Sequence, residues 1–386
     1  MPYTVLSVVS TLSRCGPMDG LMNVIRYLDP SKYRAVVATL SAEPSDSVIE
    51  SLRSLGVPVT QMGLSRIGSL LFGTRGVRRL VSEIKPDLVH SSGLRADVLI
   101  AGAGLECPIV STVHSDLFED YRFAYGRVFG TLTAMRQYAA LRRFDAVNTV
   151  SEPLAEIVLR SGITAHGIAN GVELGRYYPA PDEKYIRLLR ARLGWPADAV
   201  VVLHTGVLRN LKNPVEIVTG FRASQLSKRG FLAFAGEGPV REACELAAGT
   251  APNIKFLGKR GDVDDLLRAA DLLISASSSE GISNALIEGC ATGIQVLATD
   301  IPPHRYTQHM FPDQMRLFDL RGWDSVRAAL DSVEPETWRQ RFVPLPHTLN
   351  MISSRRMSRQ YQEFYSDILE SRHRATSGQE SVASCR

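Results

Sequence analysis

Hydrophobic residues in the first half of the chain fall into short runs rich in β-branched residues, and longer amphipathic segments separate these runs. Strands that helices bury on both faces have this appearance, so the alternation predicts a parallel sheet covered by helices on each side. Five runs are the predicted strands of this sheet, at residues 5–9, 35–40, 88–90, 109–113 and 146–150.

The same rhythm begins again after Asn170-Gly171 and a polar, proline-bearing stretch at residues 178–183. A second set of strands is predicted at residues 200–204, 231–235, 254–257, 272–275 and 296–299, each followed by a helix-like segment. The chain is therefore expected to belong to the α/β class, with one doubly wound unit following another and a ligand between them. A length of 386 residues also favours two hydrophobic cores over one.

An apolar stripe near the C-terminus predicts one further helix, at residues 353–370. Its members are spaced as on one helical face: Met357, Tyr361, Phe364, Tyr365 and Ile368. From Ser371 onward the sequence is polar and has no such stripe, so residues 371–386 are expected to form a disordered tail.

Composition is that of an ordinary soluble protein. The net charge of +4 is modest, and no block of like charge is long enough to indicate a nucleic-acid partner. Five scattered cysteines without a Cys-x-x-Cys pair indicate reduced thiols and no structural zinc site. The first residues do not resemble a secretion signal, and Glu106-Cys107-Pro108 interrupts the most apolar stretch, at residues 98–113. We therefore expect a cytoplasmic protein without a transmembrane helix, and a helix, turn and buried strand at 98–113.

The residues with the clearest chemical meaning follow the predicted strand at 272–275. Glu280-Gly281 comes at the strand end, and Glu288 lies in the helix-like segment that begins near Asn284. A helix N-terminus favours phosphate, and Gly281 would let the backbone approach it, whereas carboxylates suit the hydroxyls of a ribose or sugar. Taken alone, this pattern is more typical of a solvated loop acid and a first-turn acid.

Four motifs together resemble the donor site of family-four retaining glycosyltransferases, which have the GT-B fold. These motifs are residues 277–288, the glycine-to-lysine loop at 206–214, the loop at 257–263 and the hinge at 170–173. The resemblance implies two doubly wound Rossmann-like domains facing across a cleft. Residues 1–170, completed by the helix at 353–370, would form the acceptor-side domain, and residues 171–350 would bind the nucleotide sugar.

The resemblance also implies roles for individual residues. Glu280 would lie beside the transferred sugar, Glu288 would hold the ribose, and Lys212 with Arg209 would stabilise the departing diphosphate. His114 would contact the sugar from the first domain. Further donor contacts are implied for Gly16, Gly236, Arg260, Gly281, Ile282, Ser283 and Asn284.

Several of these residues have a second interpretation. The family usually has arginine at the position of Val207, so either Arg209 reaches the same space or one phosphate contact is missing. Gly236 is equally compatible with a tight turn, and His114 with a structural histidine. His90 is a neighbouring candidate without direct contact to the sugar.

Asp262-Val263-Asp264 looks like the Asp-x-Asp metal motif of the other main glycosyltransferase fold. Because it opens a helix-like segment, we expect these aspartates to cap the helix. No cluster of residues has metal-ligand spacing, so neither a metal nor a cofactor besides the donor substrate is expected.

Residues 121–144 contain five arginines and no acidic residue. Their apolar stripe consists of Val128, Leu132, Met135 and Ala139. An ordinary helix with its stripe on the core is the favoured interpretation, and peripheral contact with an anionic membrane is the alternative.

The predicted activity is metal-independent, retaining transfer of a sugar from a nucleoside diphosphate donor, with uridine favoured by family frequency. The expected acceptor is a saccharide, lipid-linked, in the synthesis of a surface polysaccharide such as lipopolysaccharide or capsule. The protein would work in the cytoplasm, with a peripheral position on the inner face of the plasma membrane as a further expectation. A catalytically silent scaffold or binding protein and a nucleotide-sugar hydrolase or epimerase remain alternatives, because Val207, Gln295 and Tyr306 depart from the family pattern.

Overall fold

The computed structural model describes residues 1–332, 337 and 339–383. It divides the chain into two compact units, after Gly171 and again after Ser353. Unit 1 consists of residues 1–171 and the C-terminal segment from Ser354, and unit 2 consists of residues 172–353.

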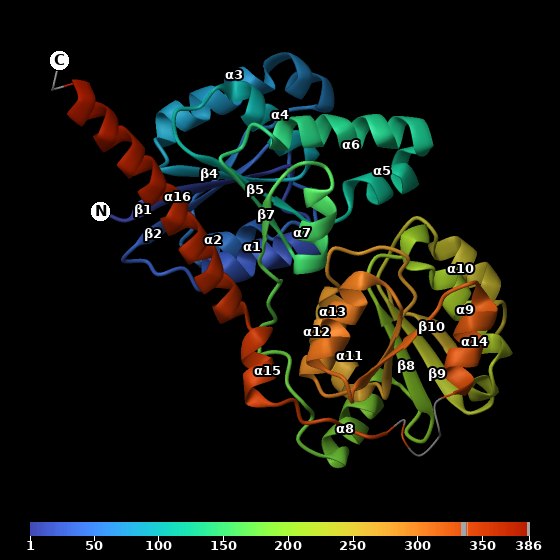
Figure 1. The fold of residues 1–386 in the computed structure, drawn as a ribbon. Helices are drawn as coiled ribbons and strands as arrows, with labels where there is room; N and C mark the ends of the chain where they lie inside the picture. The colour runs from blue at the N-terminus through green and yellow to red at the C-terminus, as the bar shows by residue number, and fades with distance from the viewer. Residues whose placement is uncertain (333–336, 338, 384–386) are drawn as a thin grey trace. The chain divides into compact units, whose positions relative to one another are not determined.

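Unit 1 contains a seven-stranded parallel sheet with the order β3-β2-β1-β4-β5-β6-β7 (Figure 1). Strands run outward in both directions from β1, as in a doubly wound fold. The strands are β1 Tyr3–Val9, β2 Tyr33–Thr39, β3 Val59–Gln61, β4 Leu88–Ser92, β5 Ile109–Val113, β6 Ala146–Thr149 and β7 Ala165–Gly167. The helices are α1 Gly16–Arg26, α2 Ile49–Ser54, α3 Arg66–Ile84, α4 Leu94–Ala103, α5 Leu117–Tyr125, α6 Arg127–Leu141, α7 Glu152–Leu159 and α16 Ser354–Ala383.

Helices cover both faces of this sheet, so its strands are nearly continuous runs of buried side chains. One hydrophobic cluster joins the strands to α3 and α4, and another joins them to α1 and α2. The last helix, α16, completes unit 1 with a buried stripe that includes Met357, Tyr361, Phe364 and Tyr365.

Unit 2 contains a six-stranded parallel sheet with the order β10-β9-β8-β11-β12-β13. Its strands are β8 Val200–Thr205, β9 Gly230–Ala235, β10 Ile254–Phe256, β11 Leu272–Ser275, β12 Gln295–Thr299 and β13 Met315–Phe318. Its helices are α8 Glu183–Leu193, η1 Asn210–Lys212, α9 Pro214–Ala223, η2 Gln225–Lys228, α10 Arg241–Ala248, α11 Val263–Ala269, α12 Asn284–Ala291, α13 Pro302–Met310, α14 Trp323–Asp331 and α15 Pro346–Met351. Two hydrophobic clusters fill the two faces of the sheet.

All ten predicted strands are present, and the prediction of two Rossmann-like units is confirmed. Residues 98–113 form the end of α4, a turn and β5, as expected. Within the described residues, no helix combines the length and apolar character needed to cross a membrane.

The expected disordered tail is wrong for residues 371–383, because α16 continues to Ala383. This segment lacks an apolar stripe but contains arginine, glutamine, glutamate and alanine, which favour the helix. A helix that is already nucleated and docked extends at low cost. Residues 384–386 of that prediction lie outside the described part of the chain.

The favoured interpretation of the α6 stripe is also wrong. Val128, Leu132, Met135 and Ala139 are all exposed. The buried face of α6 is instead formed by Gly130, Ala134, Gln137, Tyr138, Ala140 and Leu141. Periodicity located the stripe correctly but did not reveal which face met the core, because four of the six buried residues are glycine, alanine or glutamine.

Candidate functional site

The loops that follow β8 and β11 bring two of the predicted site residues together in unit 2. Lys212 Nζ lies 2.8 Å from Glu280 Oε1, and their side chains are only 16% and 9% exposed. Ser277 Oγ donates a hydrogen bond of 2.6 Å to the same Glu280 oxygen. The pair therefore lies at the carboxyl edge of the sheet, where doubly wound folds bind ligands.

Asn213 fastens the two loops that carry this pair. Its Nδ2 donates to the carbonyl oxygen of Ala276 at 2.8 Å and to Ser278 Oγ at 2.7 Å. Its backbone is left-handed, with φ of 47°, a conformation that asparagine tolerates better than most residues. Because Asn213 directly follows Lys212, these bonds fix the position of Lys212 relative to the loop that carries Glu280.

Opposing effects set the charge of Glu280. Burial alone would raise the pKa of its carboxyl group, but the neighbouring charges of Lys212 and His304 and the hydrogen bonds from Lys212 and Ser277 lower the pKa below its ordinary value. Glu280 is therefore a carboxylate at neutral pH, held beside a cation in a poorly solvated position.

Two buried histidines that the sequence interpretation missed lie near this pair. His204 Nδ1 is 3.1 Å from the carbonyl oxygen of Ile274, and His304 Nδ1 is 2.8 Å from that of Thr299. Their Nε2 atoms are buried without a hydrogen-bond partner in the described residues. Burial lowers both pKa values, that of His204 to about 4, and the charges of Lys212 and Glu280 act on both rings. His204 is the last residue of a predicted strand, which was an available sequence signal, whereas His304 lies within α13, five residues after the predicted strand that ends at Thr299.

The N-terminus of α12 lies next to Glu280 in the chain. Gly281, Ile282 and Ser283 are buried, and Ser283 is the N-cap residue of a helix that begins at Asn284. The Ser283 side chain makes no capping hydrogen bond. The first amides of α12 are thus left without the N-cap side-chain oxygen that commonly accepts from them, an arrangement suited to an anion.

Gly236 has a packing role in the structure. Its φ is 155°, and a Cβ atom there would lie 1.8 Å from the carbonyl oxygen of Gly206. Its N–H donates to the carbonyl oxygen of Gly258 at 2.8 Å. Three loops at the carboxyl edge of the sheet therefore approach one another through glycine backbones, which accounts for this glycine as a tight turn.

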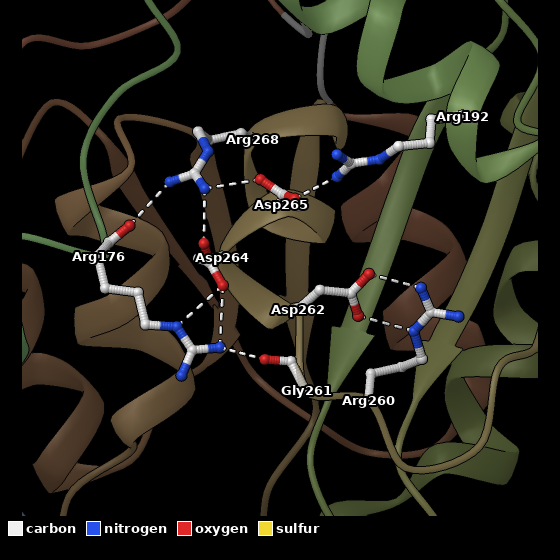
Figure 2. Close-up of polar contacts among 8 residues, drawn as sticks. All are labelled: Arg176, Arg192, Arg260, Gly261, Asp262, Asp264, Asp265 and Arg268. Carbon is white, nitrogen blue, oxygen red and sulfur yellow. Dashed lines mark hydrogen bonds and ion pairs between the residues drawn. The ribbon is translucent and has the colours of Figure 1, made fainter.

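The acidic residues at the start of α11 are paired with arginines, as Figure 2 shows. Arg260 makes two hydrogen bonds to Asp262, of 2.8 and 2.6 Å, and Asp264 pairs with Arg176 and Arg268. Asp262 is the N-cap residue but makes no side-chain capping bond, so the capping prediction is wrong for its carboxylate. Arg260 lies close enough in sequence to take that carboxylate. No group of three or more potential metal ligands occurs among the residues that the structure describes.

Glu288 and Arg209 are half-buried residues of the same unit. Glu288 lies in α12, and its charge acts on Arg176: burial would lower the pKa of that guanidinium, but Tyr177, Asp264 and Glu288 raise it. Arg209 is the residue before η1, the short helix that ends at Lys212.

Two histidines line a cavity in unit 1 together with Pro17 and Asn170. His114 follows β5, and its Nε2 lies 2.8 Å from Ser92 Oγ. His90 uses both ring nitrogens, toward Tyr365 at 2.7 Å and Thr112 at 2.8 Å, which is a structural arrangement. Burial lowers the pKa of His114 to about 4 and, with the charge of His114, that of His90 to about 3, so both are neutral near pH 7. Gly16, the first residue of α1, is adjacent to Pro17.

Comparisons with known proteins agree with this architecture. The model named Glycosyltransferase Family 4 matches residues 20–176, and the model named Glycosyl transferases group 1 matches residues 199–315. A putative teichuronic acid biosynthesis glycosyltransferase, TuaC of Bacillus subtilis, is 28% identical over 61% of this chain and 58% of its own length. An Escherichia coli UDP-Gal:alpha-D-GlcNAc-diphosphoundecaprenol alpha-1,3-galactosyltransferase is 24% identical over 67% of this chain and 68% of its own.

Among solved structures, Anabaena HepE in complex with UDP and glucose superposes with a TM-score of 0.77. The sequences are 18% identical, and the match covers 95% of this chain and 100% of HepE, which establishes the shared GT-B fold. The first family model falls on unit 1 except for its last five residues, and the second lies within unit 2. The chain therefore carries a Glycosyltransferase Family 4 domain followed by a Glycosyl transferases group 1 domain, in a GT-B fold.

Proposed function

We propose that the chain transfers a sugar from a UDP-sugar to a lipid-linked saccharide, with retention of anomeric configuration and without a metal, during synthesis of a surface polysaccharide. The observation that carries this proposal is the Lys212–Glu280 pair beside the start of α12. The names of two relatives support the substrate classes: one is a putative teichuronic acid biosynthesis glycosyltransferase, and the other uses UDP-Gal and a GlcNAc-diphosphoundecaprenol acceptor.

The donor diphosphate is the group that this arrangement suits best. Negative charge grows on the leaving phosphate as the bond to the sugar breaks, and a poorly solvated cation stabilises that charge strongly. Lys212 would exchange its Glu280 partner for the phosphate, and the amides at the start of α12 would add hydrogen bonds. Glu280, freed from Lys212, would accept a hydrogen bond from a hydroxyl of the transferred sugar.

Retention follows from a transfer on one face of the sugar. The bond from the anomeric carbon to the phosphate oxygen breaks, and a bond from that carbon to the acceptor oxygen forms on the same side. The acceptor proton passes to the departing phosphate oxygen. No pair of carboxyl groups at the spacing of a glycosidase is needed.

The remaining predicted residues complete the proposed donor contacts. Glu288 would bind the ribose hydroxyls, and Arg209 would approach the diphosphate from the loop that carries Lys212. His114, as a neutral imidazole, would hydrogen-bond the sugar. Backbone and side-chain contacts are proposed for Gly16, Gly236, Arg260, Gly281, Ile282, Ser283 and Asn284.

The experiment is a donor panel of UDP- and GDP-sugars given to the purified protein with a chelator present. We expect nucleotide release from one UDP-sugar, stimulated by a lipid-linked saccharide and lost in Lys212→Met, with Lys228→Met as an exposed control. Nuclear magnetic resonance of the product would report the anomeric configuration. Binding without turnover would favour a silent scaffold, turnover without transfer a hydrolase or epimerase, and no nucleotide binding would refute the donor site.

A further inference from the structure

Large hydrophobic side chains are exposed in an unusual concentration on three helices of unit 1. Of 22 such side chains that the described residues expose, ten lie on α3, α5 and α6. Single exposed hydrophobic residues are normal, but a concentrated group marks an interaction surface. The ten are Ile67, Leu70, Leu71, Phe72, Phe123, Tyr125, Val128, Phe129, Leu132 and Met135.

The exposed face of α6 lies opposite the face that packs against unit 1. Val128, Phe129, Leu132 and Met135 are 55–73% exposed. At 100° per residue they lie about half a turn from the buried residues, whose centre is near Ala134. These four side chains therefore contribute almost nothing to the core of unit 1.

The first two turns of α3 have the same character. Ile67, Leu70, Leu71 and Phe72 are 57–71% exposed. The packed side contains Gly73, where a Cβ atom would lie 2.6 Å from the side chain of Leu99 in α4. A small residue thus brings α3 close to α4 while its large apolar residues face solvent.

The two exposed faces belong to one side of unit 1. Both α3 and α6 pack against α4, and the three helices lie along the same side of the sheet in Figure 1. Because α5 packs against α6, Phe123 and Tyr125 are near the exposed residues of α6. We call the surface that these ten residues form on α3, α5 and α6 the apolar surface of unit 1.

The charges on this surface are almost all positive. Residues 66–82 and 121–144 contain no aspartate or glutamate. Arg75, Arg127 and Arg136 are exposed among these apolar residues. The nearest acidic residues on the same helices are Glu83, which pairs with Arg79, and Glu119 with Asp120 at the start of α5.

We propose that the apolar surface docks unit 1 on an anionic lipid bilayer, with α3 and α6 lying in the headgroup region and their arginines against lipid phosphates. Apolar side chains flanked by cations match the boundary between acyl chains and anionic headgroups. A second copy of the chain fits less well, because two such surfaces would bring their arginines together. This inference goes beyond the proposed sugar transfer, and its evidence is independent of the donor site.

The test is sedimentation of the full chain with vesicles of phosphatidylglycerol and phosphatidylethanolamine in equal parts, and with vesicles of phosphatidylcholine. We expect binding to the anionic vesicles that weakens with salt. Leu71→Ser with Phe72→Ser on α3, and Phe129→Ser with Leu132→Ser on α6, should each weaken binding at least tenfold. Leu188→Ser with Leu246→Ser, which are equally exposed in unit 2, should bind as wild type.

Charge variants keep the test decisive if a serine variant does not fold. Arg75→Glu with Arg136→Glu should reduce the affinity for anionic vesicles at least roughly 25-fold, about fivefold for each arginine. Arg75→Lys with Arg136→Lys, which keeps both positive charges, should retain binding. The proposal is overturned if the wild type does not bind anionic vesicles. It is also overturned if the serine variants and the glutamate variants of α3 and α6 all bind these vesicles as well as the wild type does. It is also overturned if the wild type forms a dimer that the serine variants dissociate and neither form binds vesicles. Donor binding measured in the same variants separates this result from failure of the sugar-transfer proposal.

Discussion

Lys212 and Glu280 are 68 positions apart in the chain, yet they form a largely buried ion pair with 2.8 Å between Nζ and Oε1. Each charge compensates the other in the absence of a ligand. Removing one partner of a buried pair is costly because the remaining charge is left poorly solvated. An anionic ligand that takes Lys212 must therefore offer a better partner than Glu280, and this exchange gives two separate predictions.

Lys212→Met should reduce transfer far more than the exposed control Lys228→Met. Loss of one group that stabilises developing charge commonly lowers the rate by about 10² to 10³. Single-turnover nucleotide release, with donor at saturation, measures this step apart from binding. A wild-type rate in Lys212→Met would exclude Lys212 from leaving-group stabilisation.

Glu280→Gln should lower the thermal stability of unit 2 and make that stability depend more on UDP. The neutral amide leaves the Lys212 charge without its counterion, and the UDP phosphates would replace it. The melting temperature with and without UDP is the measurement. A UDP-induced rise no larger than that of wild type would contradict the exchange of partners.

Acid should destabilise unit 2 through His204. Its pKa is about 4 in the folded protein because of burial, below the unfolded value of about 6.5. As pH falls through this interval the unfolded chain gains a proton that folded His204 does not, so the free energy of unfolding decreases by about 3 kcal/mol in total. This contribution is fully present above pH 6.5 and lost below pH 4.

His204→Phe should flatten the pH dependence of the free energy of unfolding between these values. Above pH 7 the slopes of variant and wild type should agree, which serves as the internal control. Urea unfolding at a series of pH values gives both slopes. Equal slopes between pH 4 and 6.5 would show that His204 is protonated alike in both states.

Asp264→Ala should destabilise unit 2 by about 1.5–3 kcal/mol, because it removes one of the two carboxylates that bind Arg268, whose side chain is 3% exposed, and leaves Asp265 as the other. Asp319→Ala, which breaks an exposed pair with Arg321, should cost less than about 1 kcal/mol. Urea unfolding compares the two variants directly. Similar costs for both would mean that the arginines around α11 find other partners.

A stop codon after Ser353 should prevent stable folding of unit 1, because the buried stripe of α16 would be missing. A stop after Arg374 keeps that stripe and should leave protection from hydrogen exchange in the β1 strand unchanged. Hydrogen exchange followed by mass spectrometry tests both chains. Full protection in the shorter chain would show that unit 1 folds without α16.

The sequence predicted the ten strands with strong apolar runs but missed β3, β7 and β13. Each of these has only three or four residues and lies at the edge of its sheet, so it pairs on one side and needs no long β-branched run. Family motifs drew attention to Lys212 and Glu280, which the structure brings together in unit 2. They did not indicate His204 and His304, since the burial of a ring depends on neighbours that are distant in sequence. The sequence also did not show which of several possible partners a side chain would bind. The Asp262 carboxylate, for example, accepts hydrogen bonds from Arg260 and does not cap α11.

The division of the chain places all of unit 2 between the two segments of unit 1. During synthesis, residues 172–353 leave the ribosome before the residues of α16 do, so unit 2 has its complete sequence outside the ribosome while unit 1 still lacks its last helix. Domains fold as units once their residues are available. Unit 2 can therefore mature first, and unit 1 completes its core only after the residues of α16 have followed.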